Sequence, residues 1–91
     1  MNAVRRKALK KATSRLEELL SDLEELKDEI EQIKDDEEET LDNYPENLQG
    51  SERYEAASDA LDSLCSAVDA LEEAISNIED EAISSIEDAI G

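Results

Sequence analysis

The sequence predicts an all-α protein, an antiparallel two-helix coiled-coil hairpin, and three observations support this. The 91 residues include no Phe or Trp, two Tyr, two Gly and one Pro, so the residues typical of strands and β-turns are scarce. Apolar residues recur at alternating spacings of three and four along two long segments, the pattern of a coiled-coil seam. The only Pro and the only internal Gly lie between these segments. The unbroken apolar pattern also argues against disorder, which low hydrophobicity and high charge would otherwise suggest.

The first helix is expected at about residues 3–42. Its predicted seam consists of Leu9, Ala12, Leu16, Leu19, Leu23, Leu26, Ile30 and Ile33. The seam weakens further along, because Glu37 and Thr40 occupy places that call for apolar residues. The five consecutive acids 35–39 predict a solvated or frayed helical stretch near the turn.

The turn is expected at residues 43–51 and the second helix at about 52–90. Pro45 disfavours helical geometry at Tyr44, and Ser51 is a good N-cap for a helix that begins at Glu52. The second predicted seam consists of Tyr54, Ala57, Leu61, Leu64, Val68, Leu71, Ile75, Ile78 and Ala82. The two arms match in length, so folding one back on the other brings the chain ends together.

Charge is segregated along the chain, which carries 27 acidic and nine basic residues and a net charge of −18. Six of the nine basic residues form a basic head that precedes the first acidic residue: Arg5, Arg6, Lys7, Lys10, Lys11 and Arg15. The antiparallel arrangement is expected to set five of them beside carboxylates near the C-terminus, which selects the topology. The five are Arg5, Arg6, Lys7, Lys10 and Lys11, and the carboxylates are those of Glu79, Asp80, Glu81, Glu87 and Asp88. The alternative is a basic arm reserved for an external polyanion. Direct nucleic-acid binding is not expected, because the acidic body would repel it.

A lone hairpin buries little apolar surface, so self-association is expected. Ala60, Ala67 and Ala74 recur every seven residues beside the second seam, and Leu20 and Ile83 also lie off the main seams. These five residues are the predicted oligomer interface of a dimer of hairpins, a four-helix bundle. Domain-swapped open helices would have the same seams.

The C-terminal segment contains an eight-residue repeat, 74–81 followed by 82–89. Eight residues exceed two helical turns, so the isoleucine stripe is expected to wrap around the helix and to contact more than one neighbour. Helix growth by duplication is the alternative explanation.

The composition argues against catalysis. The chain has no histidine, no phosphate-binding loop and no His/Cys metal spacing, so neither an enzyme nor a metal or other cofactor is expected. The single cysteine, Cys65, is interpreted as a packing residue. No apolar stretch approaches the length of a membrane span and no signal peptide is evident, which predicts a cytoplasmic protein without membrane contact.

Two features are candidates for binding. The first is an acidic surface on the second helix, which could bind a basic protein or could be an ordinary solvated face; it consists of Asp59, Asp62, Asp69, Glu72, Glu73, Glu79 and Asp80. The second is the turn, whose polar and aromatic residues could hold a small anionic or planar ligand: Tyr44, Asn47, Gln49, Ser51, Arg53 and Tyr54. In the alternative interpretation, Arg53 neutralises nearby acids (Glu37 to Glu39 or Glu55) and Tyr54 opens the seam.

The repeats 16–19 and 23–26 (both Leu-Glu-Glu-Leu), the turn 44–54 and the sequence Ala-Leu-Glu-Glu-Ala at 70–74 resemble small acidic hairpin proteins encoded by phages and prophages of Gram-positive gut bacteria. The resemblance implies that the protein acts in the cytoplasm of a bacterial host, and it identifies no known site residues. The predicted function is a self-associating, non-enzymatic phage accessory protein that blocks a host factor, such as a defence factor, through its acidic surface. An oligomeric sponge for a small anionic or nucleotide-like ligand at the turn and a purely structural coiled-coil scaffold are the alternatives.

Overall fold

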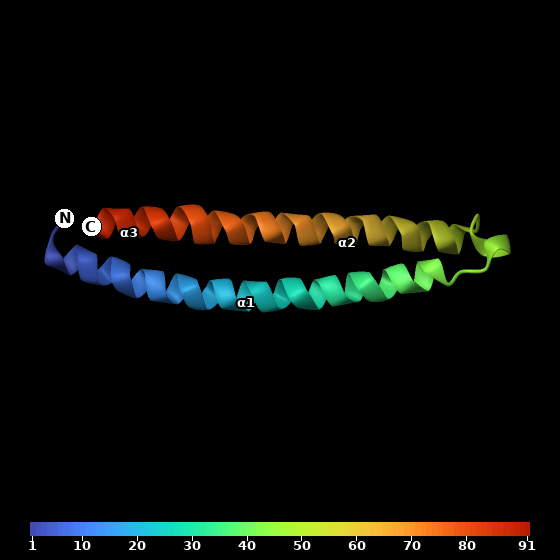
Figure 1. Cartoon of the computed structure of the whole chain (residues 1–91), viewed down its shortest axis with the longest axis horizontal. Helices are drawn as coiled ribbons and strands as arrows, with labels where there is room; N and C mark the ends of the chain where they lie inside the picture. Colours follow the sequence, from blue (N-terminus) through green and yellow to red (C-terminus); the bar gives the residue numbers. More distant parts are fainter.

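The computed structural model describes all 91 residues and shows an all-helical hairpin. Helix α1 (Ala3–Asp42) is the first arm; the second arm runs without a break through α2 (Glu52–Ser76), the π-helical segment η2 (Asn77–Ile83) and α3 (Ser84–Ile90). The arms lie side by side as a rod of 69 × 16 × 14 Å, with both termini at one end and the turn at the other (Figure 1). The predicted helical hairpin is therefore confirmed.

Both arms begin at a capped end. The Asn2 side-chain oxygen accepts a hydrogen bond of 2.8 Å from the Arg5 backbone N–H, and Ser51 Oγ accepts one of 3.2 Å from the Tyr54 N–H. These contacts satisfy N–H groups that have no partner inside the helix. In between, a short 3₁₀ turn, η1 (Glu46–Leu48), follows Pro45.

The acidic run 35–39 is helical throughout, since α1 continues to Asp42. The Gln32 side-chain amide donates to the Asp36 carboxylate at 3.1 Å, and the Thr40 hydroxyl donates to the Asp36 carbonyl at 3.1 Å. These bonds support the helix across a stretch of like charges.

The seam that α1 presents to the second arm differs from the predicted one. The buried or half-buried residues of this row, which continues into the turn, are Leu9, Thr13, Leu16, Leu20, Leu23, Lys27, Ile30, Lys34, Glu37, Leu41 and Tyr44. Four predicted seam residues, Ala12, Leu19, Leu26 and Ile33, are exposed instead. The two rows share Leu9, Leu16, Leu23 and Ile30, so either could form the seam. The hairpin uses the row that includes Lys27 and Lys34 but reaches Leu41 at the turn, where the predicted row has Thr40.

The predicted seam of the second arm faces α1 as far as Ile78, and there the spacing changes. Ala82 is exposed and Ile83 is buried, so the seam steps by five residues at this point. The π-helical segment η2 adds one residue to its turn and thereby absorbs the extra residue of the eight-residue repeat. Ile83, Ile86 and Ile90 therefore stay in line with the preceding seam, and the expected wrapping around the helix does not occur.

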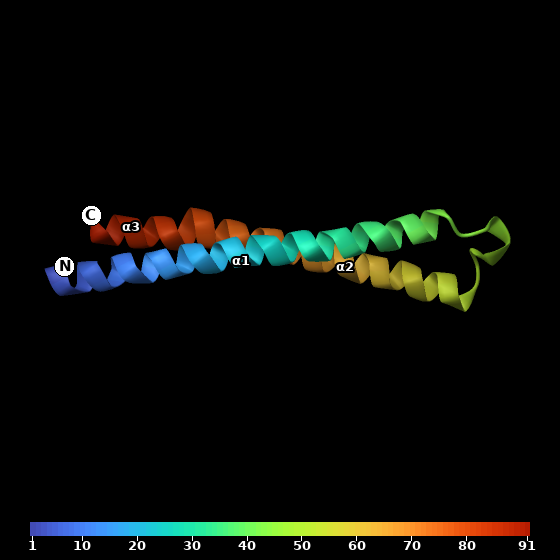
Figure 2. The ribbon, with the colours of Figure 1, turned by 90° about the horizontal axis from the view of Figure 1, so that it is seen from below.

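The core of the rod is thin. Only Leu41, Val68, Ile83 and Thr13 are buried, and the Thr13 hydroxyl has no hydrogen-bond partner. Figure 2 shows the two arms crossing near the middle of the rod. No helix is both long enough and apolar enough to span a membrane.

The basic head does not form the expected ion pairs with the C-terminal carboxylates, because every ion pair within 4.0 Å involves Lys27 or Lys34. Helix α1 begins slightly beyond the end of α3 (Figure 1), so its start has no arm beside it. Lys10 and Glu87 line the same shallow hollow without pairing. Exposed pairs of this kind gain little energy over solvated side chains.

Candidate functional site

The predicted acidic surface lies on one side of the second arm. All seven of its residues are exposed, and each comes one or two positions after a seam residue; for example, Asp62 follows Leu61 and Glu72 follows Leu71. At about 100° per residue, these positions share one side of a helix. The structure thus brings the seven carboxylates together as a continuous strip rather than scattering them around the arm.

The first arm extends this strip. Four of its carboxylates also come directly after a seam residue. They are Glu17, Glu24, Glu31 and Glu38, which follow Leu16, Leu23, Ile30 and Glu37, respectively. A hollow of about 460 Å³ lined by residues of both arms, Glu24 and Glu72 among them, shows that the two sets share one side of the hairpin. We call the seven predicted residues together with these four the acidic side.

Lys27 is the cation between the arms. Its Nζ lies 3.3 Å from Asp28 Oδ1, 3.6 Å from Glu31 Oε2 and 4.0 Å from Glu72 Oε1, and the last contact is the one ion pair that joins the arms. The hydrogen bond to Asp28, followed by the attraction of the neighbouring carboxylates, raises the pKa of Lys27 above its ordinary value, although burial opposes the shift.

Lys34 repeats this arrangement one heptad later. Its Nζ lies 3.4 Å from Asp35 Oδ1, and the hydrogen bond to Asp35 likewise raises the pKa of Lys34. Both lysine side chains are about one-fifth exposed, at 22% and 20%. Their aliphatic stems therefore cover the seam while their ammonium groups reach carboxylates at its edge.

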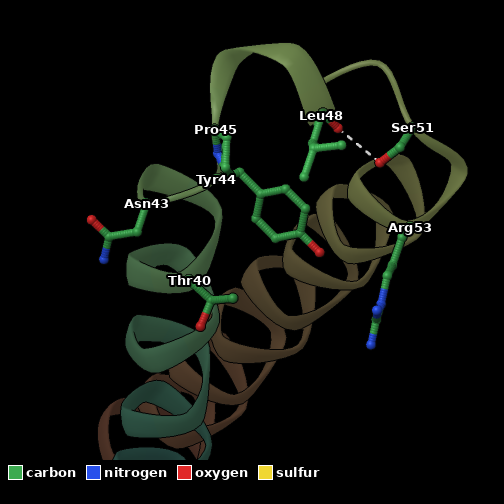
Figure 3. Close-up of a pocket in the computed structure, with 7 residues that line it drawn as sticks. All are labelled: Thr40, Asn43, Tyr44, Pro45, Leu48, Ser51 and Arg53. Atoms are coloured by element: carbon green, nitrogen blue, oxygen red, sulfur yellow. Dashed lines mark hydrogen bonds between the residues drawn. The ribbon is translucent and has the colours of Figure 1, made fainter.

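The turn contains the largest hollow of the molecule, an open depression of about 550 Å³. Figure 3 shows the Tyr44 ring lying between the end of α1 and the start of the second arm. The ring meets that of Tyr54 edge-on, with centroids 5.3 Å apart. Ser51 Oγ donates a hydrogen bond of 2.7 Å to the Leu48 carbonyl.

The structure brings together only part of the predicted turn site. Tyr44, Ser51 and Arg53 line the hollow, together with Thr40, Asn43, Pro45 and Leu48. Asn47, Gln49 and Tyr54 do not line it. Arg53 is exposed and forms no ion pair within 4.0 Å, so the expected neutralisation of nearby acids by Arg53 is not seen.

The predicted oligomer residues are divided between two environments. Leu20 and Ile83 lie in the hairpin's own seam, where they contribute to its core. Ala60 and Ala67 are exposed and Ala74 is half-buried, and each directly precedes a seam residue. The alanines therefore lie on the side of the second arm that carries none of the seven predicted carboxylates.

Sequence reasoning missed the exposed counterpart of these alanines on α1. Ala12, Leu19, Leu26 and Ile33 also directly precede seam residues. In an antiparallel pair, such positions of the two arms lie on the same side of the hairpin. A hollow lined by Ala12, Leu19 and Ile86 shows this side opening between α1 and α3. The signal was present in the heptad pattern, where the row 12, 19, 26, 33 was assigned to the wrong seam.

No group of three or more Cys, Asp or Glu side chains is arranged to hold a metal ion. No protein-family model matches the chain, and comparisons with curated proteins and with solved structures likewise give no significant match.

Proposed function

We propose that this chain is a non-enzymatic binding protein whose acidic side occupies a basic surface on a protein partner. The observation that carries the proposal is the grouping of the predicted carboxylates on one side of the second arm. Lys27 and Lys34, the two cations at the seam, are held there by adjacent carboxylates. An extended strip of one sign attracts a surface of the opposite sign and orients it.

In the phage setting that the resemblance implies, this partner is a host protein, such as a defence factor, and binding blocks its basic surface. A rod 69 Å long and 16 Å wide offers a rigid, nearly straight row of carboxylates for this purpose. The row is built on helices rather than loops, so little ordering entropy opposes binding.

The test compares two variants with equal changes in charge. The first replaces Asp62, Asp69, Glu72 and Glu73 by the corresponding amides, and the matched control does the same at Glu25, Asp35, Asp36 and Glu39, which lie outside the acidic side. Each immobilised protein is exposed to a bacterial lysate and eluted with NaCl rising from about 0.05 M to about 0.5 M, and retained proteins are identified by mass spectrometry.

We expect the wild type and the control to retain the same basic protein and the first variant to lose it. Equal loss from both variants would mean that bulk charge alone retains the protein, and it would overturn the proposal.

The turn supports a second candidate function, a sponge for a small anionic ligand, because Tyr44, Ser51 and Arg53 meet around one open hollow. A guanidinium group beside an aromatic ring can hold an anionic, planar molecule by hydrogen bonding and stacking. Native mass spectra of gently purified protein distinguish the two functions. A small constant extra mass that disappears in Arg53→Ala supports the sponge, whereas protein binding that survives Arg53→Ala supports the acidic side.

A further inference from the structure

The side of the hairpin that lacks the strip of carboxylates has an exposed row of large apolar residues. Leu19, Leu26 and Ile33 are 63%, 51% and 58% exposed, respectively, and with Ala12 they recur every seven residues along α1. At a rise of about 1.5 Å per residue, the row is about 32 Å long. Single exposed leucines are ordinary, but an aligned row on a rod with a thin core is typical of an interaction surface.

The second arm contributes a matching row of alanines to the same side. The π-turn places Ala82 and Ala89 directly before the seam residues Ile83 and Ile90, as Ala67 and Ala74 precede Val68 and Ile75. The contact of Lys27 with Glu72 fixes the relative level of the arms, so Leu26 lies near the level of Ala74, and Ile33 near that of Ala67. We call the two rows, Ala12, Leu19, Leu26 and Ile33 with Ala67, Ala74, Ala82 and Ala89, the apolar side.

The apolar side is self-complementary about its middle. Four positions on each arm run over the same stretch of the rod, and their midpoint lies next to Asp22 and Leu23 on α1. A twofold axis through this midpoint, perpendicular to the rod, sets Leu19 against Leu26 of a second copy, and Ala12 against Ile33. On the other arm it sets alanine against alanine, which lets the backbones approach closely. A surface that fits its own copy in this way is what an isologous dimer requires.

Charge selects this orientation over the one with both turns at the same end. At the end with the termini, residues 3–15 and 84–91 carry six cations and two carboxylates. At the turn end, residues 31–61 carry eleven carboxylates and two cations. Stacking head to turn places these opposite charges together at both ends of the bundle, whereas stacking turn to turn would place like charges together.

The basic head gains partners in this arrangement. The start of α1 extends past α3, and no residue of the basic head forms an ion pair within the chain. Rotation about the twofold axis brings Arg5 to Lys11 to the level of residues 34–40 of the second copy, which include the acidic run 35–39. At the rim of the apolar side, Arg15 faces Glu29 of the second copy.

We propose that the apolar side binds a second copy of this chain, head to turn, to form a four-helix bundle with a twofold axis beside Asp22. The acidic sides of both copies remain exposed on the bundle. The inference is independent of the protein partner proposed above, because it involves the opposite side of the hairpin.

The orientation is tested by cross-linking with a short bis-maleimide in a Cys65→Ser background. Asp22→Cys introduces a thiol beside the proposed axis, and Glu24→Cys introduces one on the acidic side as the matched control. We expect a cross-linked dimer from Asp22→Cys and little from Glu24→Cys. Equal yields from both variants, or no dimer from Asp22→Cys, would overturn the proposal.

The contact at the rim is tested by charge reversal, measured by sedimentation equilibrium. Arg15→Glu should raise the dissociation constant of the dimer about tenfold, because two symmetric attractions become repulsions. The double variant Arg15→Glu/Glu29→Arg should restore the wild-type constant. These residues are too far apart on one helix to meet within a chain, so rescue reports the contact between copies, and its absence would refute this orientation.

Association itself is tested by the mass of the wild-type protein at micromolar concentration, which should be twice the chain mass of 10.1 kDa. Leu26→Glu should shift the mass toward one chain, since it places a carboxylate in the middle of the apolar side. A wild-type mass of a single chain would overturn the proposal whatever the variants do.

Discussion

Lys27 and Lys34 occupy seam places where leucine would bury more apolar surface. A lysine in such a place lowers stability but fixes the register of the helices. Here each ammonium group is held by the carboxylate of the next residue, and Lys27 also reaches Glu72 across the seam. These two residues therefore contribute to the specificity of the hairpin more than to its stability.

The raised pKa values of both lysines predict an alkaline limit to stability. A group whose pKa is higher in the folded chain stabilises the fold fully below its unfolded value, here 10.5, and loses that effect as pH rises through the folded value. The free energy of unfolding should therefore fall as pH rises above 10.5.

The control for this prediction is Lys27→Met/Lys34→Met, which keeps the seam filled. It should show a smaller alkaline decrease than the wild type, measured by urea unfolding at each pH. All other side chains are the same in the two proteins, so the difference between them reports the lysines. Parallel curves for the two proteins would contradict the assignment.

The residues also show how much of the candidate site the sequence could predict. The strip of carboxylates follows from periodicity alone, because every seventh position shares a side of the helix. The choice between the rows containing Leu19 and Leu20 does not, since the Leu19 row is apolar through Ile33 but the hairpin uses the Leu20 row, which includes Lys27 and Lys34. That choice depends on which row lies against the second arm, a property of two helices that the pattern of one cannot reveal.

Within the second arm, η2 departs from regular α-helix, and the amino-acid sequence explains why. The repeat at 74–89 is one residue longer than a heptad. The sequence alone suggests that this mismatch makes the isoleucine stripe wrap around the helix. In the structure the mismatch instead changes the hydrogen bonding of the helix, where one wider turn returns the isoleucines to the seam. Burial of Ile83 and partial burial of Ile86 and Ile90 outweigh the irregular turn, since a large apolar side chain contributes about 1.5–3 kcal/mol when fully buried.

Deletion of Ala82 should therefore be tolerated. It restores the spacing of four after Ile78, so η2 should become regular α-helix while the isoleucines stay in the seam. We expect the thermal midpoint, followed by circular dichroism, to be unchanged or to rise by about 4–8 °C for each kcal/mol gained.

Deletion of Ala70 is the matched control, because it removes the same residue from a stretch with regular spacing. It turns Leu71, Ile75 and Ile78 out of the seam, and it should lower the free energy of unfolding by several kcal/mol at about 1.5–3 kcal/mol per side chain. Similar effects of the two deletions would show that η2 does not serve to preserve the seam.

For the whole molecule, repulsion between carboxylates is the main electrostatic effect at neutral pH. The chain carries 27 carboxylate side chains, yet only four ion pairs lie within 4.0 Å. Protonation of carboxylates therefore removes many repulsive contacts and few attractive ones.

Acidification from about pH 7 to about pH 4.5 should accordingly increase helicity and the thermal midpoint, because the magnitude of the negative net charge decreases as pH approaches the isoelectric point near 4.1. Circular dichroism in dilute solution measures both quantities. Added NaCl at neutral pH should act in the same direction by screening. Loss of helix on acidification would show that attractive pairs hold the rod together.

The position of both termini at one end of the rod has a practical consequence (Figure 1). A fluorophore, affinity tag or second protein joined to either terminus begins at the end opposite the turn, separated from it by nearly the full 69 Å. A donor dye at the N-terminus and an acceptor at Cys65 on the other arm, the single thiol and an exposed one, would then report by energy transfer whether the arms stay paired or swing open.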